Sequence, residues 1–345
     1  MTTTTVTNPS VSSVPQGASR LLDIDRARGL AIFLVVLGHL VAGPPPEGNA
    51  WYITMEKVIY RFHMPFFMFL PGFIMLYTYR GVDSVASYSS YVRKRFMRLA
   101  PGFFVFAVAI LLGKMAMAQF IHVDDVPESF LQEVLQIALK PGSSAAGSLW
   151  FIYVLMELYI LFPLLLLIVG GRPALLVPLA AVLYFVPATP WLMIEDLFQY
   201  LLFFTLGAIM ANHYEQYVRL LDRYAFLFIG VFLLSLGLIW TDLTKQESKL
   251  IIGLLSLPAI HALVRLPWLE KAHFLVFWGS LSYAIYLLNT IAIGVAKGVL
   301  LQFVSWHGTN FLWIAPLLLI AGLFGSIFVK KFIFPFIPPL DRVTN

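Results

Sequence analysis

The sequence predicts an all-α polytopic membrane protein with about ten transmembrane helices and both termini in the cytoplasm. Hydrophobic residues occupy 60% of the 345 positions, charged residues occupy 12%, and the mean hydropathy is +0.84. A soluble domain carries about 25% charged residues. The apolar residues also form runs of about 20, the length that crosses a bilayer, and these runs end where charges, Pro and Gly cluster.

Ten apolar runs are expected to form the spanning helices. In chain order they cover residues 22–42, 58–79, 99–120, 148–169, 173–189, 196–212, 224–241, 249–265, 274–295 and 311–333. Pro173, Pro178, Pro187 and Pro190 crowd the region of the fifth and sixth runs. We expect Pro65 and the Pro71-Gly72 pair to interrupt the second helix, as happens where a helix lines a cavity.

One membrane domain, residues 20–335, accounts for nearly the whole chain. Residues 1–19 are rich in Thr, Ser, Val and Pro, and we expect them to form a disordered cytoplasmic tail rather than a signal peptide. Residues 336–345 are expected to form a short cytoplasmic tail. No hydrophilic block of the sequence is long enough for a second, soluble domain.

The basic residues predict the orientation of the helices. With ten spans and a cytoplasmic N-terminus, sixteen of the 23 Lys and Arg residues fall in cytoplasmic loops, whereas the opposite loops are acidic. The positive-inside rule describes this asymmetry, which places the protein in the plasma membrane with its N-terminus in the cytoplasm. These loops explain the net charge of +5 without nucleic-acid binding.

Cysteine is absent from the sequence. Disulfides, thiolate metal sites and a Cys nucleophile are therefore excluded, and acyl chemistry would use His, Ser, Thr, Asp, Glu or Tyr. The acidic residues of the long loop 121–147 lack the spacing of a known cation site, so no metal is predicted.

The stretch from Asp25 to His39 is the strongest candidate for a site. Arg28 and His39 are 11 residues apart, so in one helix they lie within about 20° of each other and about 16 Å apart along the axis. Ionisable groups at membrane depth are costly and are functional by default. We expect His39, deep inside the first helix, to be catalytic, with Arg28 at the cytoplasmic end and Asp25 in support. The alternative is an arginine anchor and a histidine packed against another helix.

Arg95 and Arg98 belong to the most basic loop of the chain, Arg93–Arg98. They are three residues apart and share a face if the third helix begins there. Guanidinium groups suit phosphate, so this pair is expected to bind a phosphorylated ligand together with Arg28. The alternative is a topology anchor beside anionic lipid.

Four further residues are candidates for supporting roles. Glu157 is the one carboxylate near the middle of a predicted helix, and it either orients a histidine, carries a proton or hydrogen-bonds to a neighbouring helix. His63 is a second candidate base, and Arg61 lies beside it. Trp150 either contributes to an acceptor site or serves as an interfacial anchor.

Several stretches resemble the acyltransferase-3 family of integral membrane O-acyltransferases, in its standalone form. They are Leu22–Ala31 continuing to Val35–His39, with the family's diagnostic spacing of Arg, ten residues and His; Phe62–Phe73; Arg95-x-x-Arg98; Leu149–Phe151 with Glu157, Tyr159 and Pro163; and Ser280–Leu288. The resemblance covers about residues 20–335. Two positions depart from the family: Pro71 stands where a serine is usual, and Asn289 stands where a histidine is frequent.

The resemblance implies transfer of an acyl group, most commonly acetyl, from cytoplasmic acyl-CoA to a hydroxyl of an extracytoplasmic carbohydrate. The acceptor would be a surface polysaccharide or exopolysaccharide, free or lipid-linked, and the location a bacterial inner membrane. Acyl-CoA is then a co-substrate, and no permanently bound cofactor is expected. The phosphates of CoA would lie on Arg28, Arg95 and Arg98, with the thioester near His39, which acts as a general base or is transiently acylated.

A proton-coupled transporter is the rival hypothesis. His39, Glu157 and Lys114 would form an intramembrane proton relay, with the Pro-interrupted helices at the site. The two halves of the sequence show no convincing internal repeat, and a transporter has no particular need for Arg95 and Arg98 in line with Arg28. The enzyme is therefore the favoured hypothesis.

Overall fold

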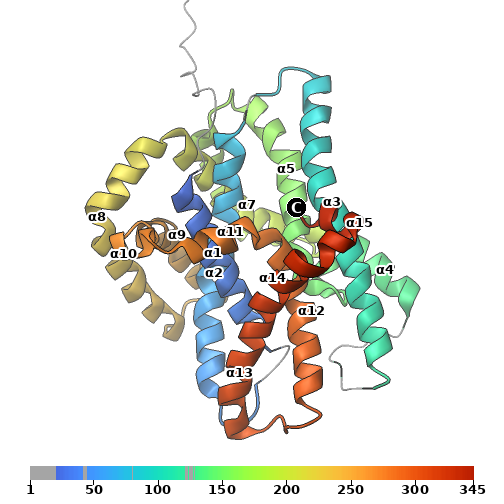
Figure 1. Cartoon of the computed structure of the whole chain (residues 1–345). Helices are drawn as coiled ribbons and strands as arrows, with labels where there is room; N and C mark the ends of the chain where they lie inside the picture. The colour runs from blue at the N-terminus through green and yellow to red at the C-terminus, as the bar shows by residue number, and fades with distance from the viewer. Residues whose placement is uncertain (1–20, 42–44, 80, 121–122, 124–126, 128) are drawn as a thin grey trace, which may run out of the picture.

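The computed structural model describes residues 21–41, 45–79, 81–120, 123, 127 and 129–345, and the predicted tail at 1–19 lies outside this range. The described residues form helices and contain no β-strand, so the all-α prediction is confirmed. In Figure 1, α8, α9 and α10 lie at one flank, α3, α4 and α15 at the other, and α1, α2 and α7 between them.

The α-helices are α1 (Leu22–Gly38), α2 (Ala50–Tyr77), α3 (Val85–Met117), α4 (Phe130–Leu139), α5 (Trp150–Ile168), α6 (Val177–Phe185), α7 (Ile194–Asn212), α8 (Tyr214–Ser235), α9 (Lys245–Leu263), α10 (Pro267–Glu270), α11 (His273–Ser280), α12 (Ser282–Leu300), α13 (Phe311–Ile320), α14 (Ser326–Phe328) and α15 (Pro338–Val343). Shorter 3₁₀ and π segments extend or join them: η1 (Pro141–Ser143), η2 (Gly147–Leu149), η3 (Pro173–Leu176), η4 (Trp191–Met193), η5 (Leu236–Trp240), η6 (Gly308–Asn310), η7 (Ala321–Gly325), η8 (Val329–Ile333) and η9 (Phe334–Phe336).

Seven helical segments of the described chain are long and apolar enough to cross a membrane, so the protein is an integral membrane protein. They are Ala50–Tyr77, Val85–Met117, Gly147–Ile168, Trp191–Asn212, Tyr214–Trp240, Ser282–Leu300 and Gly308–Phe336. The other three predicted spans are also helical and correspond to α1, to η3 with α6, and to α9. The first two are shorter than the seven segments, and α9 begins with a polar turn. The count of ten stays a prediction.

Several helix boundaries differ from the prediction. α2 begins at Ala50 and α3 at Val85, each well before its apolar run, because helical hydrogen bonding continues beyond the hydrophobic stretch. A capping box starts α3, in which Ser84 Oγ accepts a bond from the Ser87 amide at 3.2 Å. The predicted helix 274–295 is divided at Leu281 into α11 and α12.

The expected interruption of the second helix is wrong. α2 runs without a break through Pro65 and Pro71. Neighbouring helices satisfy backbone groups that a proline frees, so prolines are tolerated within membrane helices. Gly72 and Gly207 form the crossing of α2 with α7, where a Cβ on either residue would collide with a backbone carbonyl of the other helix. Without side chains the two backbones can touch, which fixes how α2 sits in the bundle.

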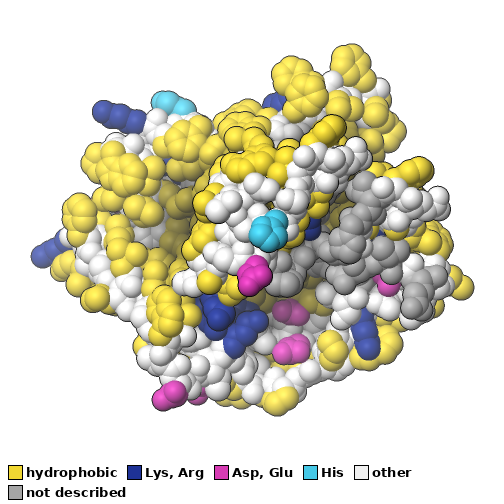
Figure 2. All heavy atoms as spheres, turned by 90° about the horizontal axis from the view of Figure 1, so that it is seen from below, with side chains coloured by type: hydrophobic (Ala, Val, Ile, Leu, Met, Phe, Trp, Pro, Cys, Tyr) yellow, Lys and Arg dark blue, Asp and Glu magenta, His cyan; other side chains and the backbone are white. Residues whose placement is uncertain are grey.

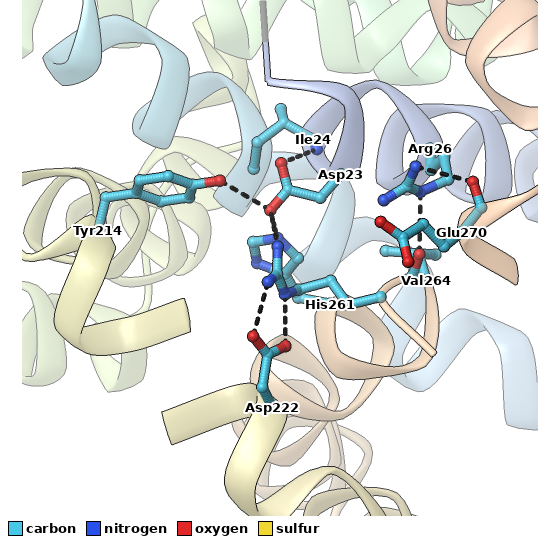
Figure 3. A network of polar contacts seen from close by, with 9 residues as sticks. Asp23, Ile24, Arg26, Tyr214, Asp222, His261, Val264 and Glu270 are labelled. Atoms are coloured by element: carbon cyan, nitrogen blue, oxygen red, sulfur yellow. Dashed lines mark hydrogen bonds and ion pairs between the residues drawn. The ribbon is translucent and has the colours of Figure 1, made fainter. Parts of the chain in front are cut away.

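A buried polar network holds the start of α1 (Figure 3). Asp23 is 4% exposed. One of its carboxylate oxygens accepts bonds from the Tyr214 hydroxyl at 2.9 Å, from His261 Nε2 at 3.2 Å and from an Arg265 nitrogen at 2.8 Å. Arg265 also bonds both carboxylate oxygens of Asp222 at 2.8 Å. The network joins α1 to α8 and to the end of α9.

The next turns of α1 are fixed by backbone contacts. Arg26 donates to the carbonyls of Val264 at 2.9 Å and Glu270 at 3.1 Å (Figure 3). A Cβ on Gly29 or on Gly279 would collide with a backbone carbonyl of the opposite helix, so α1 and α11 pack in direct backbone contact. These contacts set the direction in which Arg28 projects.

The last residues, 336–345, include the short helix α15 (Pro338–Val343), which packs on α3. Lys330 Nζ donates to Asp341 Oδ1 at 2.7 Å and to Thr344 Oγ1 at 3.1 Å. The hydrogen bond from Lys330 lowers the pKa of the Asp341 carboxyl. The predicted tail is therefore attached to the membrane domain.

Figure 2 views the end of the molecule at which α12 ends and α13 begins. Hydrophobic side chains dominate the periphery, whereas charged side chains of both signs gather in a hollow nearer the middle. An apolar periphery is what a bilayer requires of the surface facing its hydrocarbon.

Candidate active site

The structure brings Arg28, Arg95 and Arg98 to one pocket. The pocket has a volume of about 140 Å³ and lies among α1, α2, α3, α5 and α12. Its other lining residues are Phe67, Leu70, Pro71 and Ile74 of α2, Leu99 of α3, Phe151, Ile152, Leu155 and Tyr159 of α5, and Ser282, Tyr283 and Tyr286 of α12. The three arginines predicted to bind an anionic donor therefore lie together, and what they bind stays a prediction.

Arg28 is held from two directions. One terminal nitrogen donates to Ser282 Oγ at 2.9 Å, and the other lies 3.6 Å from Asp25 Oδ1. Asp25, predicted in support, thus contacts Arg28 directly. Because Ser282 opens α12, this contact also ties α12 to α1.

Arg95 is stacked as well as hydrogen-bonded. Its guanidinium lies 5.0 Å from the centre of the Tyr159 ring and 5.6 Å from that of Tyr91, and one nitrogen donates to Thr78 Oγ1 at 3.1 Å. A guanidinium has five N–H donors, so these contacts orient the group and leave donors for a ligand. Arg98 lies one helical turn further along α3, and both residues fall inside this helix rather than at its start.

Three aromatic rings line the end of the pocket away from the arginines. Phe67, Phe151 and Tyr286 are the lining residues of α2, α5 and α12 that lie farthest along each helix from the arginine contacts. The ring centres are 4.6 Å apart for Phe67 and Phe151, 5.5 Å for Phe151 and Tyr286, and 6.2 Å for Phe67 and Tyr286. We refer to these three rings as the aromatic trio.

His39 lies just beyond the aromatic trio. Its Nδ1 is 2.8 Å from Oδ1 of Asn289, which follows Tyr286 by three residues on α12. Ser282, Tyr286 and Asn289 are spaced i, i+4 and i+7, so they share one face of α12. Arg28 contacts the first of them and His39 the last, so α1 and α12 run in parallel and connect the arginine pocket with the histidine.

The expectation that His39 lies deep inside the first helix is wrong. α1 ends at Gly38, and His39 is the residue that caps it. Two tyrosine hydroxyls of α2 donate hydrogen bonds to the carbonyl oxygens at the end of α1. Tyr52 donates to the carbonyl of Leu37 at 3.3 Å, and Tyr60 donates to that of Gly38 at 3.1 Å. The apolar run continues past this point, so hydrophobicity alone could not reveal the end of the helix.

His63 and Arg61 are not brought to the pocket. The Nδ1 of His63 donates to the carbonyl of Ile59 at 2.8 Å, and its ring packs edge-on against Tyr60 with the centres 4.9 Å apart. Arg61 donates to Ser248 Oγ at 2.8 Å, on the first turn of α9. The Arg61 contact joins α2 to α9, the His63 contacts lie within α2, and the supporting roles predicted for both residues stay predictions.

Trp150 and Glu157 lie on α5, but neither lines the arginine pocket. Trp150 packs on Tyr200, with the ring centres 5.3 Å apart, and Lys249 Nζ lies 4.2 Å from the centre of the Tyr200 ring. One carboxylate oxygen of Glu157 is buried without a hydrogen-bond partner in the described part of the chain. Lys114, the third member of the hypothetical proton relay, is in the last turn of α3.

Comparison with known proteins decides the family. The sequence matches the family described as an acyltransferase domain, of the acyltransferase-3 type, over residues 21–331. The chain belongs to the acyltransferase-3 family. The prediction of an acyltransferase is thereby confirmed.

Two curated proteins are similar to this acyltransferase, and both are named nodulation protein NolL. The one from Mesorhizobium japonicum is 27% identical over 279 residues, which cover 78% of this chain and 67% of the relative. The one from Sinorhizobium fredii is 27% identical over 209 residues, 60% of this chain and 53% of the relative. No solved structure matches the acyltransferase.

Ser282 and Asn289 are the site residues that sequence reasoning missed. Both lie in or beside the stretch Ser280–Leu288, whose i, i+4, i+7 spacing of polar residues signals one face of a helix. The spacing does not reveal the partners of that face. Only the packing of α12 along α1 shows that they are Arg28 and His39.

Proposed function

We propose that this acyltransferase moves an acyl group, acetyl in the simplest case, from cytoplasmic acyl-CoA to a hydroxyl of an extracytoplasmic carbohydrate. The observation that carries the proposal is the convergence of Arg28, Arg95 and Arg98 on one pocket. The phosphates of CoA require such a cluster, because guanidinium forks bind phosphate by charge-assisted hydrogen bonds. The carbohydrate acceptor follows from the resemblance of the sequence motifs to those of the family.

The helices supply a path from the phosphates to the reacting atoms. Arg28 and His39 are about 16 Å apart along α1, a length that the extended pantetheine arm of CoA can span. The arm would pass the aromatic trio and leave the thioester beside His39. The cytoplasm then lies at the arginine end of the bundle, as the distribution of basic loops predicts, and the membrane is the bacterial inner membrane.

His39 has a defined part in this reaction. Its imidazole takes the proton from the acceptor hydroxyl while the hydroxyl oxygen attacks the thioester carbonyl. The C–S bond breaks, the new ester forms, and the CoA thiolate receives the proton from the imidazolium. In the alternative route the imidazole is acylated first and the hydroxyl attacks the acyl-imidazole. A histidine suits both routes because it exchanges protons near neutral pH.

The test follows release of free CoA from radiolabelled acetyl-CoA by purified protein in lipid nanodiscs. His39→Ala is expected to lower turnover by about 10²–10⁴-fold, the usual contribution of a general acid–base group. The exposed His273 provides a matched control, and His273→Ala should retain full turnover. Wild-type turnover in His39→Ala would remove His39 from the mechanism. If the wild type neither binds nor turns over any acyl-CoA, the proton-coupled transporter becomes the better hypothesis.

A further inference from the structure

The Asn289 side chain uses every polar group that it has. It is 0% exposed. Its Nδ2 donates to the carbonyls of Ile285 at 3.0 Å and Tyr286 at 2.7 Å, the residues four and three positions earlier on α12. Its Oδ1 faces Nδ1 of His39 at 2.8 Å.

These contacts fix the orientation of the amide. If the amide were turned by 180°, Oδ1 would lie against the two carbonyl oxygens and their lone pairs would repel. Asn289 therefore presents an acceptor to His39 and no donor. Because Oδ1 can only accept, Nδ1 of His39 must carry the hydrogen. A neutral imidazole has one N–H, so the lone pair is on Nε2.

We infer that Asn289 is a positioning residue that holds His39 in the Nδ1–H form, so that Nε2 is the atom that takes the proton or the acyl group. The catalytic part of this inference rests on the proposed function. The amide accepts the bond without adding a negative charge beside the imidazole. His39 is thereby oriented by a neutral group, unlike a catalytic histidine that is paired with a carboxylate.

Asn289 is not needed to place the backbone of His39. The carbonyls of Leu37 and Gly38 are held by the hydroxyls of Tyr52 and Tyr60, which belong to α2. The end of α1 therefore keeps its position when the amide is removed. Asn289 therefore orients the ring of His39 and does not place its backbone. Variants at position 289 are expected to fold.

A spectroscopic experiment tests this inference without an assay of activity. The protein is labelled with ¹⁵N-histidine and studied by solid-state NMR in bilayers, and His39→Gln identifies the His39 signals among those of seven histidines. The wild type should show a protonated Nδ1 and an unprotonated Nε2. Asn289→Leu has a similar size but no acceptor, and it should shift His39 towards the Nε2–H form.

Kinetics then separate a positioning role from a structural one. Asn289→Leu should lower kcat by roughly 10–100-fold, the range found when the hydrogen-bond partner that orients a metal-bound histidine is removed. The KM for acetyl-CoA should stay the same, because the arginine pocket is intact. An unchanged His39 spectrum or an unchanged kcat in Asn289→Leu would overturn the inference. If the spectra change as expected but wild-type protein releases no CoA, the proposed function fails and the assignment of the hydrogen to Nδ1 stands.

Discussion

Arg95 shows how one side chain is prepared for an anion. Tyr159 and Tyr91 support the plane of its guanidinium, and Thr78 takes one of its hydrogens. An ammonium group has the same charge but cannot stack as a plane or offer two parallel donors. The shape of the side chain, as well as its charge, should therefore matter for binding.

Replacing Arg95 by Lys tests this at the scale of one residue. Arg95→Lys should raise the KM for acetyl-CoA about 10–150-fold, because a charge-assisted hydrogen bond of about 1.5–3 kcal/mol is lost. Its kcat should change little, because His39 is untouched. Arg93 lies on the exposed side of the same helix, so Arg93→Lys should leave both constants as they are. Equal effects of the two substitutions on KM would show that the pocket does not bind the donor phosphates.

The arginines of the site could be predicted from the sequence, whereas Asn289 could not. Arg28, Arg95 and Arg98 are visible because charge is rare in this chain and their spacing places them on helix faces. The sequence marks Asn289 only as a departure from the family, and its contact with His39 appears when α12 is packed along α1. The sequence position of His63 suggests a base. Its Nδ1 donates to the carbonyl of Ile59, and its role as a base stays a prediction.

At the scale of the element, the position of α1 depends on the network around Asp23. The Asp23 carboxylate is buried between α1, α8 and α9. Together with Asp222 it balances the positive charge of Arg265. Asp222 is different, because 51% of its side chain is exposed to solvent. The two carboxylates share one arginine but differ in what their loss leaves behind.

Replacing each aspartate by alanine should therefore have unequal effects on stability. Asp23→Ala leaves Arg265, His261 and the Tyr214 hydroxyl without their common acceptor, and the cost should be about 3–5 kcal/mol. Asp222→Ala loses an exposed partner and should cost about 1 kcal/mol or less. Thermal unfolding in detergent measures both, with Asp23→Ala melting at the lower temperature. Equal melting temperatures would mean that the network does not hold α1.

The boundaries of the elements show where sequence reasoning is weak. Apolar runs locate the centres of the helices, because burial in lipid depends on hydrophobicity. They do not locate the ends, because backbone hydrogen bonds continue into polar residues, as in α3 from Val85. The end of α1 at Gly38 coincides with tertiary contacts from Tyr52 and Tyr60 of α2, which periodicity does not contain.

At the scale of the whole molecule, the orientation in the membrane can be measured because the chain has no cysteine. A single introduced cysteine is then the only thiol in the protein. Val85 is 84% exposed at the start of α3, and Phe303 is 81% exposed just after α12. The predicted topology places these two positions on opposite sides of the membrane, with Val85 in the cytoplasm.

A membrane-impermeant maleimide should therefore label Phe303→Cys in cells whose outer membrane is permeabilised and whose inner membrane is intact. Val85→Cys should react only after the inner membrane is permeabilised. The unmodified protein has no thiol and sets the background. The reverse pattern would invert the orientation. Labelling of both positions from one side would contradict the odd number of predicted spans between Val85 and Phe303.

The arrangement of Arg28 inside α1 and His39 at the cap of the same helix also limits how such a chain can change its length. One residue inserted between them would turn everything that follows by about 100° and move it by about 1.5 Å. His39 would then leave Asn289 while Arg28 stayed on Ser282. Substitutions can alter the chemistry at either end, and loops elsewhere can grow or shrink, but insertions and deletions between these two positions are excluded as a route of divergence.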